Sequence, residues 1–367
     1  MSNEGSLIDW LKGVNEEYSQ RFCSPSAQME RRSFRLKYPV GLFCFGCMDG
    51  RNNIHNATEL PAGIMKNYRH AGPWEWSNSL DQLFYGDLMY WINQGKECLV
   101  FVSYHFSKSN KDWGCAAFEC DTNKAIASNI NFKKKIERVY GAGSAVSSVL
   151  LGFETDEESM IIHGHDCAQV LRVADLVEFN ETDIQEKLTV LFPGISLEVK
   201  NLLLRLISGN FNHVSKNRRK NRPAVALNHN ERVVAVGQGL GWFYRPNQAI
   251  IIGMHSNKSG EAIVKAVKIV YDNLLSGRIS KEKGFILLAS SSFCRDIRAE
   301  KLMGCAGSEE RRACERAKEN MRFALEVIKA HLPKKKYSEL MPYMHLLTVI
   351  TDLDTGKFIE VKDTDLD

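Results

Sequence analysis

The stretch Val40–Arg51 reads VGLFCFGCMDGR and decides how the rest of the chain is interpreted. Its first half is a short apolar run, which is typical of a buried strand in a mostly parallel sheet. Its second half places Cys47, Asp49 and Arg51 directly after that strand. Ligands of open α/β sheets bind at the carboxyl ends of the strands, so this stretch predicts a functional site at a sheet edge.

From Val40 onward, apolar runs alternate with segments of helical periodicity, which predicts an α/β fold with a mostly parallel sheet flanked by helices. The chain before it reads as an amphipathic helix and a polar connector, an N-terminal helical arm. We expect strands at Val40–Gly46, Gly63–Tyr68, Cys98–Tyr104 and Val149–Phe153, and helices at Ser77–Gln94 and Asn123–Tyr140.

The same order of elements recurs in the second half of the chain, which predicts a duplication. Five pairs of segments align: Lys96–Phe106 with Lys283–Phe293, Gly114–Ala116 with Gly304–Ala306, Val149–His163 with Leu347–Val361, Leu42–Arg51 with Pro223–Arg232, and Ser77–Gln94 with Ser256–Ser276. The predicted domains are a helical arm (1–38), a zinc-binding catalytic unit (39–178), a linker (179–221) and a degenerate second unit without metal (222–367).

A metal site is predicted in the first unit. The strand Cys98–Tyr104 delivers His105 at its carboxyl end, and a polar loop then returns Cys115. Two thiolates and an imidazole, here Cys47, His105 and Cys115, are ligands that Zn²⁺ prefers. Three protein ligands leave one position open, which is typical of a catalytic zinc rather than a structural one.

These residues also resemble a known family. Cys47-x-Asp49-x-Arg51, then Tyr68-Arg69-His70-Ala71-Gly72, then His105 and Gly114-Cys115 are similar to the motifs of the β-class carbonic anhydrases. The segment between His105 and Cys115 is longer than in ordinary β-class members. With a second unit that lacks ligands, it resembles the divergent branch, carboxysome shell carbonic anhydrase, over its catalytic and carboxy-terminal domains. The separate amino-terminal helical domain of that branch has no full counterpart in residues 1–38.

The resemblance implies reversible, zinc-dependent hydration of carbon dioxide to bicarbonate and a proton, with Asp49 and Arg51 as a catalytic dyad. Zinc lowers the pKa of bound water towards about 7 and so supplies hydroxide at neutral pH. Asp49, held ionised by Arg51, orients that zinc-bound hydroxide; alternatively, Asp49 binds zinc as a fourth ligand and closes the site. His70 and His55 are candidates for the proton shuttle.

The second unit is expected to hold no metal. In the alignment above, Cys47 falls on Asn228, Asp49 on Asn230, His105 on Ser292 and Cys115 on Cys305. An Asn, a Ser and a single thiol do not make a zinc site. The β-class enzymes work as dimers whose active sites lie at the subunit interface. We therefore expect the second unit to line the metal-binding site of the first unit, and the chain to form a homo-oligomer.

Two other functions remain open: a soluble zinc subunit of an inorganic-carbon uptake complex, and a non-catalytic zinc scaffold. The net charge of +4 is small for 367 residues and argues against a nucleic-acid binder. No apolar run approaches the roughly 20 residues that a bilayer requires, so no membrane span is expected. The expected location is cytoplasmic and, by the resemblance, within a carboxysome, with other carboxysome components as partners.

Overall fold

The structure is a computed structural model that describes residues 6–141, 145–220, 230–243, 245, 247–256, 258–294 and 308–362. The chain forms two compact units, one of Ser26–Leu227 and one that combines Met1–Pro25 with Asn228–Asp367. In the residues that the structure describes, no helix is long and apolar enough to cross a membrane.

The unit Ser26–Leu227 is built on a mixed six-stranded sheet of order β2-β1-β3-β4-β5-β6. The first four strands of that order are parallel, and β5 and β6 add antiparallel pairs at one edge. The strands are β1 Gly41–Cys47, β2 Met65–His70, β3 Cys98–Phe106, β4 Val146–Glu154, β5 Ser159–His163 and β6 Val170–Arg172. The central strands β1, β3 and β4 are buried along nearly their whole length, as their apolar sequences predicted.

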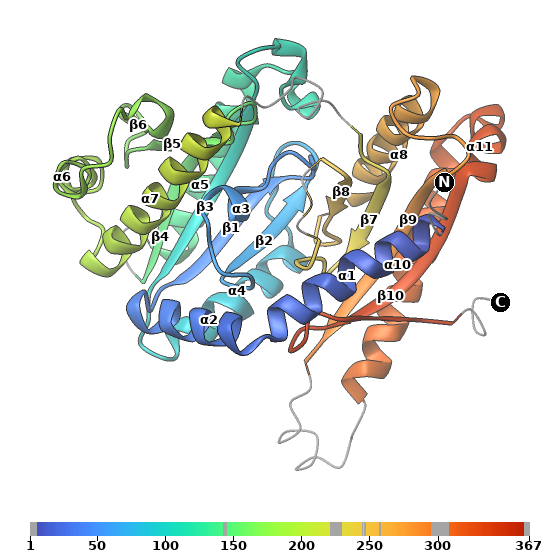
Figure 1. The fold of residues 1–367 in the computed structure, drawn as a ribbon, viewed down its shortest axis with the longest axis horizontal. Helices are drawn as coiled ribbons and strands as arrows, with labels where there is room; N and C mark the ends of the chain where they lie inside the picture. Colours follow the sequence, from blue (N-terminus) through green and yellow to red (C-terminus); the bar gives the residue numbers. More distant parts are fainter. Residues whose placement is uncertain are drawn as a thin grey trace. The chain divides into compact units, whose positions relative to one another are not determined.

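Helices cover both faces of this sheet (Figure 1). Side chains of α4 and α5 pack on one face with Phe45 and Val102, and side chains of α6 and α7 pack on the other with Leu99 and Phe101. The α-helices of this part of the chain are α2 Pro25–Lys37, α3 Ile54–Ala57, α4 Asn78–Ile92, α5 Thr122–Tyr140, α6 Glu181–Leu191 and α7 Leu197–Arg219. Short 3₁₀ turns are η1 Lys111–Trp113, η2 Ala116–Phe118 and η3 Val173–Asp175.

Two segments have more structure than the sequence suggested. Residues 179–221, predicted as a linker, contain α6 and α7, whose apolar side chains enter the core of the first unit. The N-terminal arm is two helices, α1 Leu7–Cys23 and α2, which meet at Ser24 and Pro25. Pro is favoured in the first turn of a helix, so it starts α2 in what read as a polar connector.

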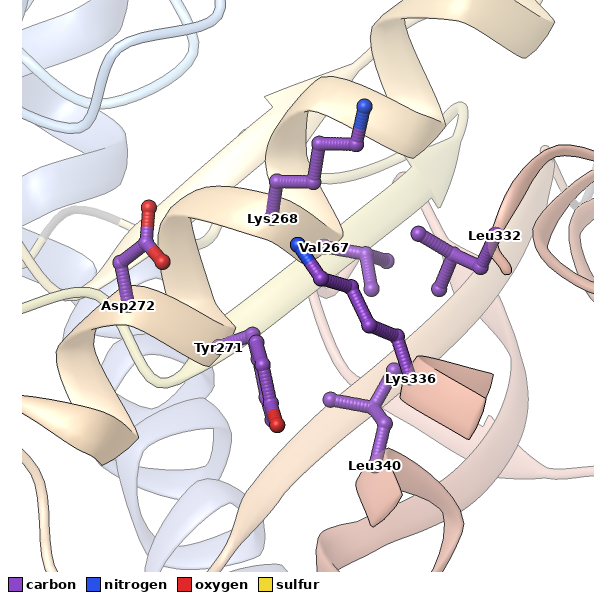
Figure 2. Close-up of a pocket in the computed structure, with 7 residues that line it drawn as sticks. All are labelled: Val267, Lys268, Tyr271, Asp272, Leu332, Lys336 and Leu340. Carbon is purple, nitrogen blue, oxygen red and sulfur yellow. The ribbon is translucent and has the colours of Figure 1, made fainter. Parts of the chain in front are cut away.

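The other unit has a five-stranded sheet of order β11-β10-β9-β7-β8, drawn in yellow to red in Figure 1. Its strands are β7 Val233–Gly237, β8 Ala249–Ile252, β9 Phe285–Phe293, β10 Met344–Asp352 and β11 Phe358–Glu360. Its helices are α1, α8 Ser259–Leu275, α10 Ser308–His331 and α11 Lys334–Leu340, with the 3₁₀ turn η5 Met341–Tyr343. Between α8 and α11 lies a groove of about 100 Å³, lined by residues that include Val267, Leu332 and Leu340 (Figure 2).

The two sheets share one strand order and one set of strand directions when β1 to β5 are matched with β7 to β11. The register agrees as well. Leu42 pairs with Leu99 as Val233 pairs with Ile286, and Phe106 pairs with Glu154 as Phe293 pairs with Asp352. The strands β3 and β9 therefore hold equivalent positions, and His105 is equivalent to Ser292, as the sequence predicted.

One of the five alignments is wrong. The strand register matches Leu42 with Val233, not with Pro223, so Gly46 corresponds to Gly237 and Cys47 to Gln238. The sequence alignment slipped because Pro223–Arg232 resembled a strand running into a polar turn, whereas the buried strand β7 begins only at Val233. Asn228 and Cys305 lie outside the described residues.

Candidate metal centre

Two neighbouring parallel strands bring the first two candidate ligands together. Cys47 is the last residue of β1, and His105 is the second last of β3. The two strands pair in register from Gly41 to Phe45, so they end at the same edge of the sheet. His105 is 1% exposed, and its position follows from a strand that is apolar on both faces.

A folded loop returns Cys115 to that edge. The Ser107 hydroxyl donates to Asp156 Oδ1 over 2.7 Å, and the Ser109 N–H donates to Asp156 Oδ2 over 2.7 Å, which anchors the loop to the segment after β4. Asn110 then caps η1 by accepting from the Asp112 N–H. The Cys115 carbonyl accepts from the Phe118 and Cys120 N–H groups, so the backbone around this thiol is fixed.

The three candidate ligand atoms, from Cys47, His105 and Cys115, lie within 4.8 Å of one another. The two sulfur atoms are 3.8 Å apart. Both ring nitrogens of His105 are buried and have no hydrogen-bond partner in the described chain. A buried imidazole is costly without a partner, and a metal ion beside two thiols would supply one. The described residues therefore contain a group that can hold a metal ion of the zinc class.

The two thiols lie within hydrogen-bond distance of each other, and this contact shifts their pKa values in opposite directions. The hydrogen bond to Cys115, with burial, raises the pKa of Cys47. The same hydrogen bond lowers the pKa of Cys115. A cation of charge +2 favours both thiolates, because a metal-bound thiol is deprotonated.

Asp49 and Arg51 form a closed pair beside the cluster. Arg51 Nη2 donates to Asp49 Oδ2 over 2.7 Å, and Arg51 Nε donates to Asp49 Oδ1 over 3.1 Å. Arg51 Nη2 also donates to the Trp113 carbonyl over 2.9 Å, which links the pair to the loop of Cys115. Asp49 Oδ2 lies 3.9 Å from His105 Nε2, so the carboxylate faces the candidate ligands. The bidentate geometry fixes the direction of the Asp49 carboxylate.

Arg69 supports this turn from β2. Its Nη2 donates to the Asn52 carbonyl over 2.6 Å, and its Nη1 lies 3.4 Å from the Asp49 carbonyl. The sequence placed Arg69 in a family-like motif but gave it no role. No spacing rule could have found it, because its acceptors are backbone atoms of a different element.

The cluster lines a small cavity together with Trp74, Phe118 and Asn129. Its volume is about 10 Å³, room for about one water molecule. Asn129 donates to the Ser103 carbonyl over 3.1 Å and is 3% exposed, so this wall is fixed. Asn129 comes from α5, and no sequence pattern indicated that it would reach the site.

Of the two shuttle candidates, His70 pairs with Cys47 across the sheet and packs against Trp74. His55 lies on α3, and burial lowers its pKa to about 4. His55 is therefore neutral at pH 7. A shuttle role for either residue stays a prediction.

Cys47 and His105 at the carboxyl ends of two parallel strands, with Cys115 from the following loop and an Asp-Arg pair beside them, define a candidate metalloprotein of the α/β class. Residues 47–190 match the family model "Carboxysome Shell Carbonic Anhydrase, catalytic domain". The matched segment begins at Cys47 and includes every candidate ligand. Residues 47–190 therefore match the catalytic domain of the carboxysome shell carbonic anhydrase family, as the resemblance predicted.

Named relatives are distant. A carboxysome shell carbonic anhydrase of Hydrogenovibrio crunogenus is 25% identical over 253 residues, which cover 59% of this chain and 48% of the relative. One of Prochlorococcus marinus subsp. pastoris is 21% identical over 225 residues, which cover 53% of this chain and 44% of the relative. The chain thus spans about half the length of the curated relatives it matches.

Proposed function

We propose that this protein catalyses the reversible hydration of carbon dioxide to bicarbonate and a proton, with zinc held by Cys47, His105 and Cys115. The observation that supports it most is the Cys-His-Cys group with the carboxylate of Asp49 held beside it by Arg51. When bound, zinc lowers the pKa of a coordinated water towards about 7 and so supplies a nucleophile at neutral pH.

The chain's own residues orient and confine the reaction. An ionised carboxylate only accepts hydrogen bonds, so Asp49 directs a proton-bearing group beside the cluster. Arg51 binds both oxygens of that carboxylate and so holds it in place beside the candidate metal ligands. Trp74 and Phe118 give the cavity apolar walls, which suit an uncharged substrate such as carbon dioxide.

Carbon dioxide hydration measured by stopped flow, with zinc determined on the same sample, tests the proposal. We expect catalysis that depends on zinc and disappears with a chelator. A protein that binds zinc but does not hydrate carbon dioxide would be a scaffold, and the proposal would then be wrong.

The relatives are named for the carboxysome shell. We extend this to the chain as part of the proposal: it acts with carboxysome components as a homo-oligomer. Co-purification of the tagged protein with carboxysome shells from its host tests this point. Co-purification with an integral membrane protein would instead favour the carbon-uptake subunit.

A further inference from the structure

The helix α7 lies beyond the matched residues 47–190. It nevertheless contacts the segment that follows Asp49 and Arg51, namely α3 and the residues after it. Arg205 of α7 donates from Nη2 to the Glu59 carbonyl over 2.8 Å and from Nη1 to the Thr58 carbonyl over 3.3 Å. Both carbonyls directly follow the short helix α3. The guanidinium therefore caps the carboxyl end of α3.

The two elements approach as closely as backbones can. A Cβ atom on Gly209 of α7 would lie only 2.0 Å from the Thr58 carbonyl oxygen. Thr58 is fully buried, and its hydroxyl donates to the Ile54 carbonyl within α3. Any side chain at position 209 would push α3 away from α7.

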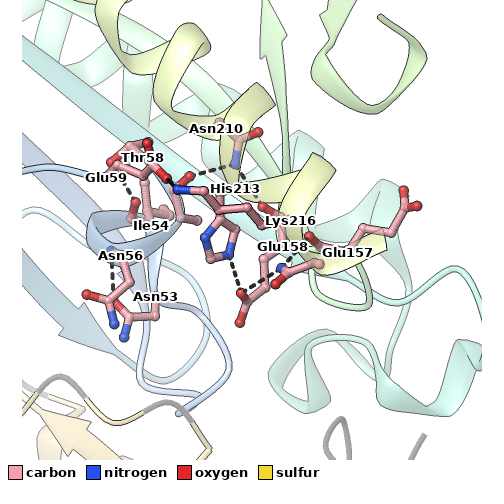
Figure 3. Close-up of polar contacts among 12 residues, drawn as sticks. Asn53, Ile54, Asn56, Thr58, Glu59, Glu157, Glu158, Asn210, His213 and Lys216 are labelled. Carbon is pink, nitrogen blue, oxygen red and sulfur yellow. Dashed lines mark hydrogen bonds and ion pairs between the residues drawn. The ribbon is translucent and has the colours of Figure 1, made fainter. Parts of the chain in front are cut away.

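Asn210 adds hydrogen bonds to the contact between α7 and α3. Its Nδ2 donates to the Glu158 carbonyl over 2.8 Å (Figure 3) and to the Ala57 carbonyl over 3.0 Å, and its Oδ1 accepts from the Met160 N–H. The side chain is 0% exposed. Lys216 and His213, further along α7, pair with Glu59 and Glu158 in the same view. One helix thus ties α3 to the turn after β4.

The helix α3 directly follows the turn of residues 49–53, which contains Asp49 and Arg51. Asn53 caps α3 through its side chain, and its N–H donates to the Arg51 carbonyl over 3.0 Å. The Asn52 N–H donates to the Asp49 carbonyl over 3.0 Å. With only the four residues Ile54–Ala57, α3 cannot hold its own position, since helices this short are unstable alone. A shift of α3 is passed directly to Asp49 and Arg51.

We propose that α7 positions the Asp49–Arg51 pair through α3, with Arg205 and Gly209 as the positioning residues. This rests on the proposed function, because the position of Asp49 and Arg51 affects the rate only if the pair acts in that reaction. A catalytic group misplaced by about 1 Å by a remote change costs about 100-fold in rate.

Two arginines of α7 provide a matched experiment. Arg205→Met removes the donors to α3 but keeps an aliphatic chain. Arg218→Met is the control, because Arg218 lies on the same helix but bonds Glu157 and the Ala174 carbonyl instead. We expect Arg205→Met to lower kcat by about tenfold with KM nearly unchanged, and Arg218→Met to leave both within about twofold.

Hydrogen–deuterium exchange gives a readout that is independent of activity. Backbone amides of residues 49–59 should exchange faster in Arg205→Met than in Arg218→Met, while both variants keep one zinc per chain. Gly209→Ala should produce the same faster exchange through steric displacement. Equal exchange and equal kcat in the two arginine variants would overturn the proposal. If the unmodified protein does not hydrate carbon dioxide, the proposed function fails, whereas the exchange result still reports on α7.

Discussion

At the scale of single residues, the Asp49 carboxylate is held in place by Arg51. Both carboxylate oxygens accept from Arg51, and Oδ1 also accepts from the Arg51 backbone N–H over 2.8 Å. Arg51 is 4% exposed, so water weakens this pair very little. The pair holds the Asp49 carboxylate beside the candidate ligands, with Oδ2 at 3.9 Å from His105 Nε2.

Asp49→Asn should keep zinc bound but lower kcat for hydration by about 100-fold or more, because a neutral amide also donates and no longer directs the proton. Stopped-flow kinetics with zinc analysis measures both effects. Asp112→Asn, an exposed carboxylate of η1, is the matched control and should change neither. Near-normal turnover in Asp49→Asn would show that the dyad role is wrong.

The buried, unpartnered imidazole of His105 leads to a second prediction. The purified protein should carry about one zinc per chain, with sulfur at about 2.3 Å and nitrogen at about 2.0–2.1 Å in X-ray absorption spectra. His105→Ala should lose most of the zinc, whereas His345→Ala, which changes an exposed histidine of β10, should keep it. Two zinc ions per chain in the unmodified protein would contradict the single site.

At the scale of elements, the loop between β3 and α5 depends on Asp156. Ser107 is 6% exposed, and its hydroxyl lies within 2.7 and 3.0 Å of the two Asp156 oxygens. The loop carries Cys115, so its anchor determines where the second thiol lies.

Ser107→Ala should raise the zinc dissociation constant by about tenfold, because it leaves Asp156 without its hydroxyl donor and loosens the loop. Competition with a chromophoric chelator measures the constant. Ser338→Ala on the exposed face of α11 should leave it unchanged. An unchanged constant in both variants would mean that the loop holds its shape without this anchor.

The sheet beneath the site depends on Phe45, which is fully buried and contacts Tyr68, Trp74 and Phe84 at centroid distances of 4.7–5.0 Å. Phe45→Ala should lower the free energy of unfolding by about 3–5 kcal/mol, through lost burial and the cavity left behind. Urea unfolding measures this free energy. The control is Tyr85→Ala, which changes an exposed side chain of α4 and should lower the free energy of unfolding by well under about 1 kcal/mol. Equal losses would show that the core does not centre on Phe45.

At the scale of the whole molecule, the N-terminal helix is part of the unit formed by the second half of the chain. Asn15 of α1 donates to the Gly356 carbonyl over 2.9 Å and accepts from the Phe358 N–H over 2.9 Å. Leu11 and Val14 of the same helix are buried. The first and last parts of the chain therefore fold as one unit.

Deleting residues 228–367 should give an insoluble or inactive product, because it exposes the buried side chains of Leu11 and Val14 on α1. Deleting residues 1–25 as well should improve solubility but not restore hydration activity. Size-exclusion chromatography and stopped flow test the two points. An active fragment of residues 26–227 would contradict a supporting role for the second unit.

The sequence alone determined the strands and the residue types at their ends. Apolar runs such as Cys98–Tyr104 encode a buried strand locally, and a polar residue after each run must then lie at the sheet edge. This is why Cys47 and His105 could be predicted as neighbours, and why the α/β class and the shared position of β3 and β9 were correct.

Only the tertiary structure decided the rest, because those contacts join distant parts of the chain. Matching Leu42 with Val233 required the observed strand register, because the sequence does not show where a polar turn ends and the buried strand β7 begins. The roles of Arg69 and Arg205 needed coordinates, because both side chains bind backbone carbonyls, which any residue offers. Sequence specifies which side chains are available, and packing decides which backbone atoms they reach.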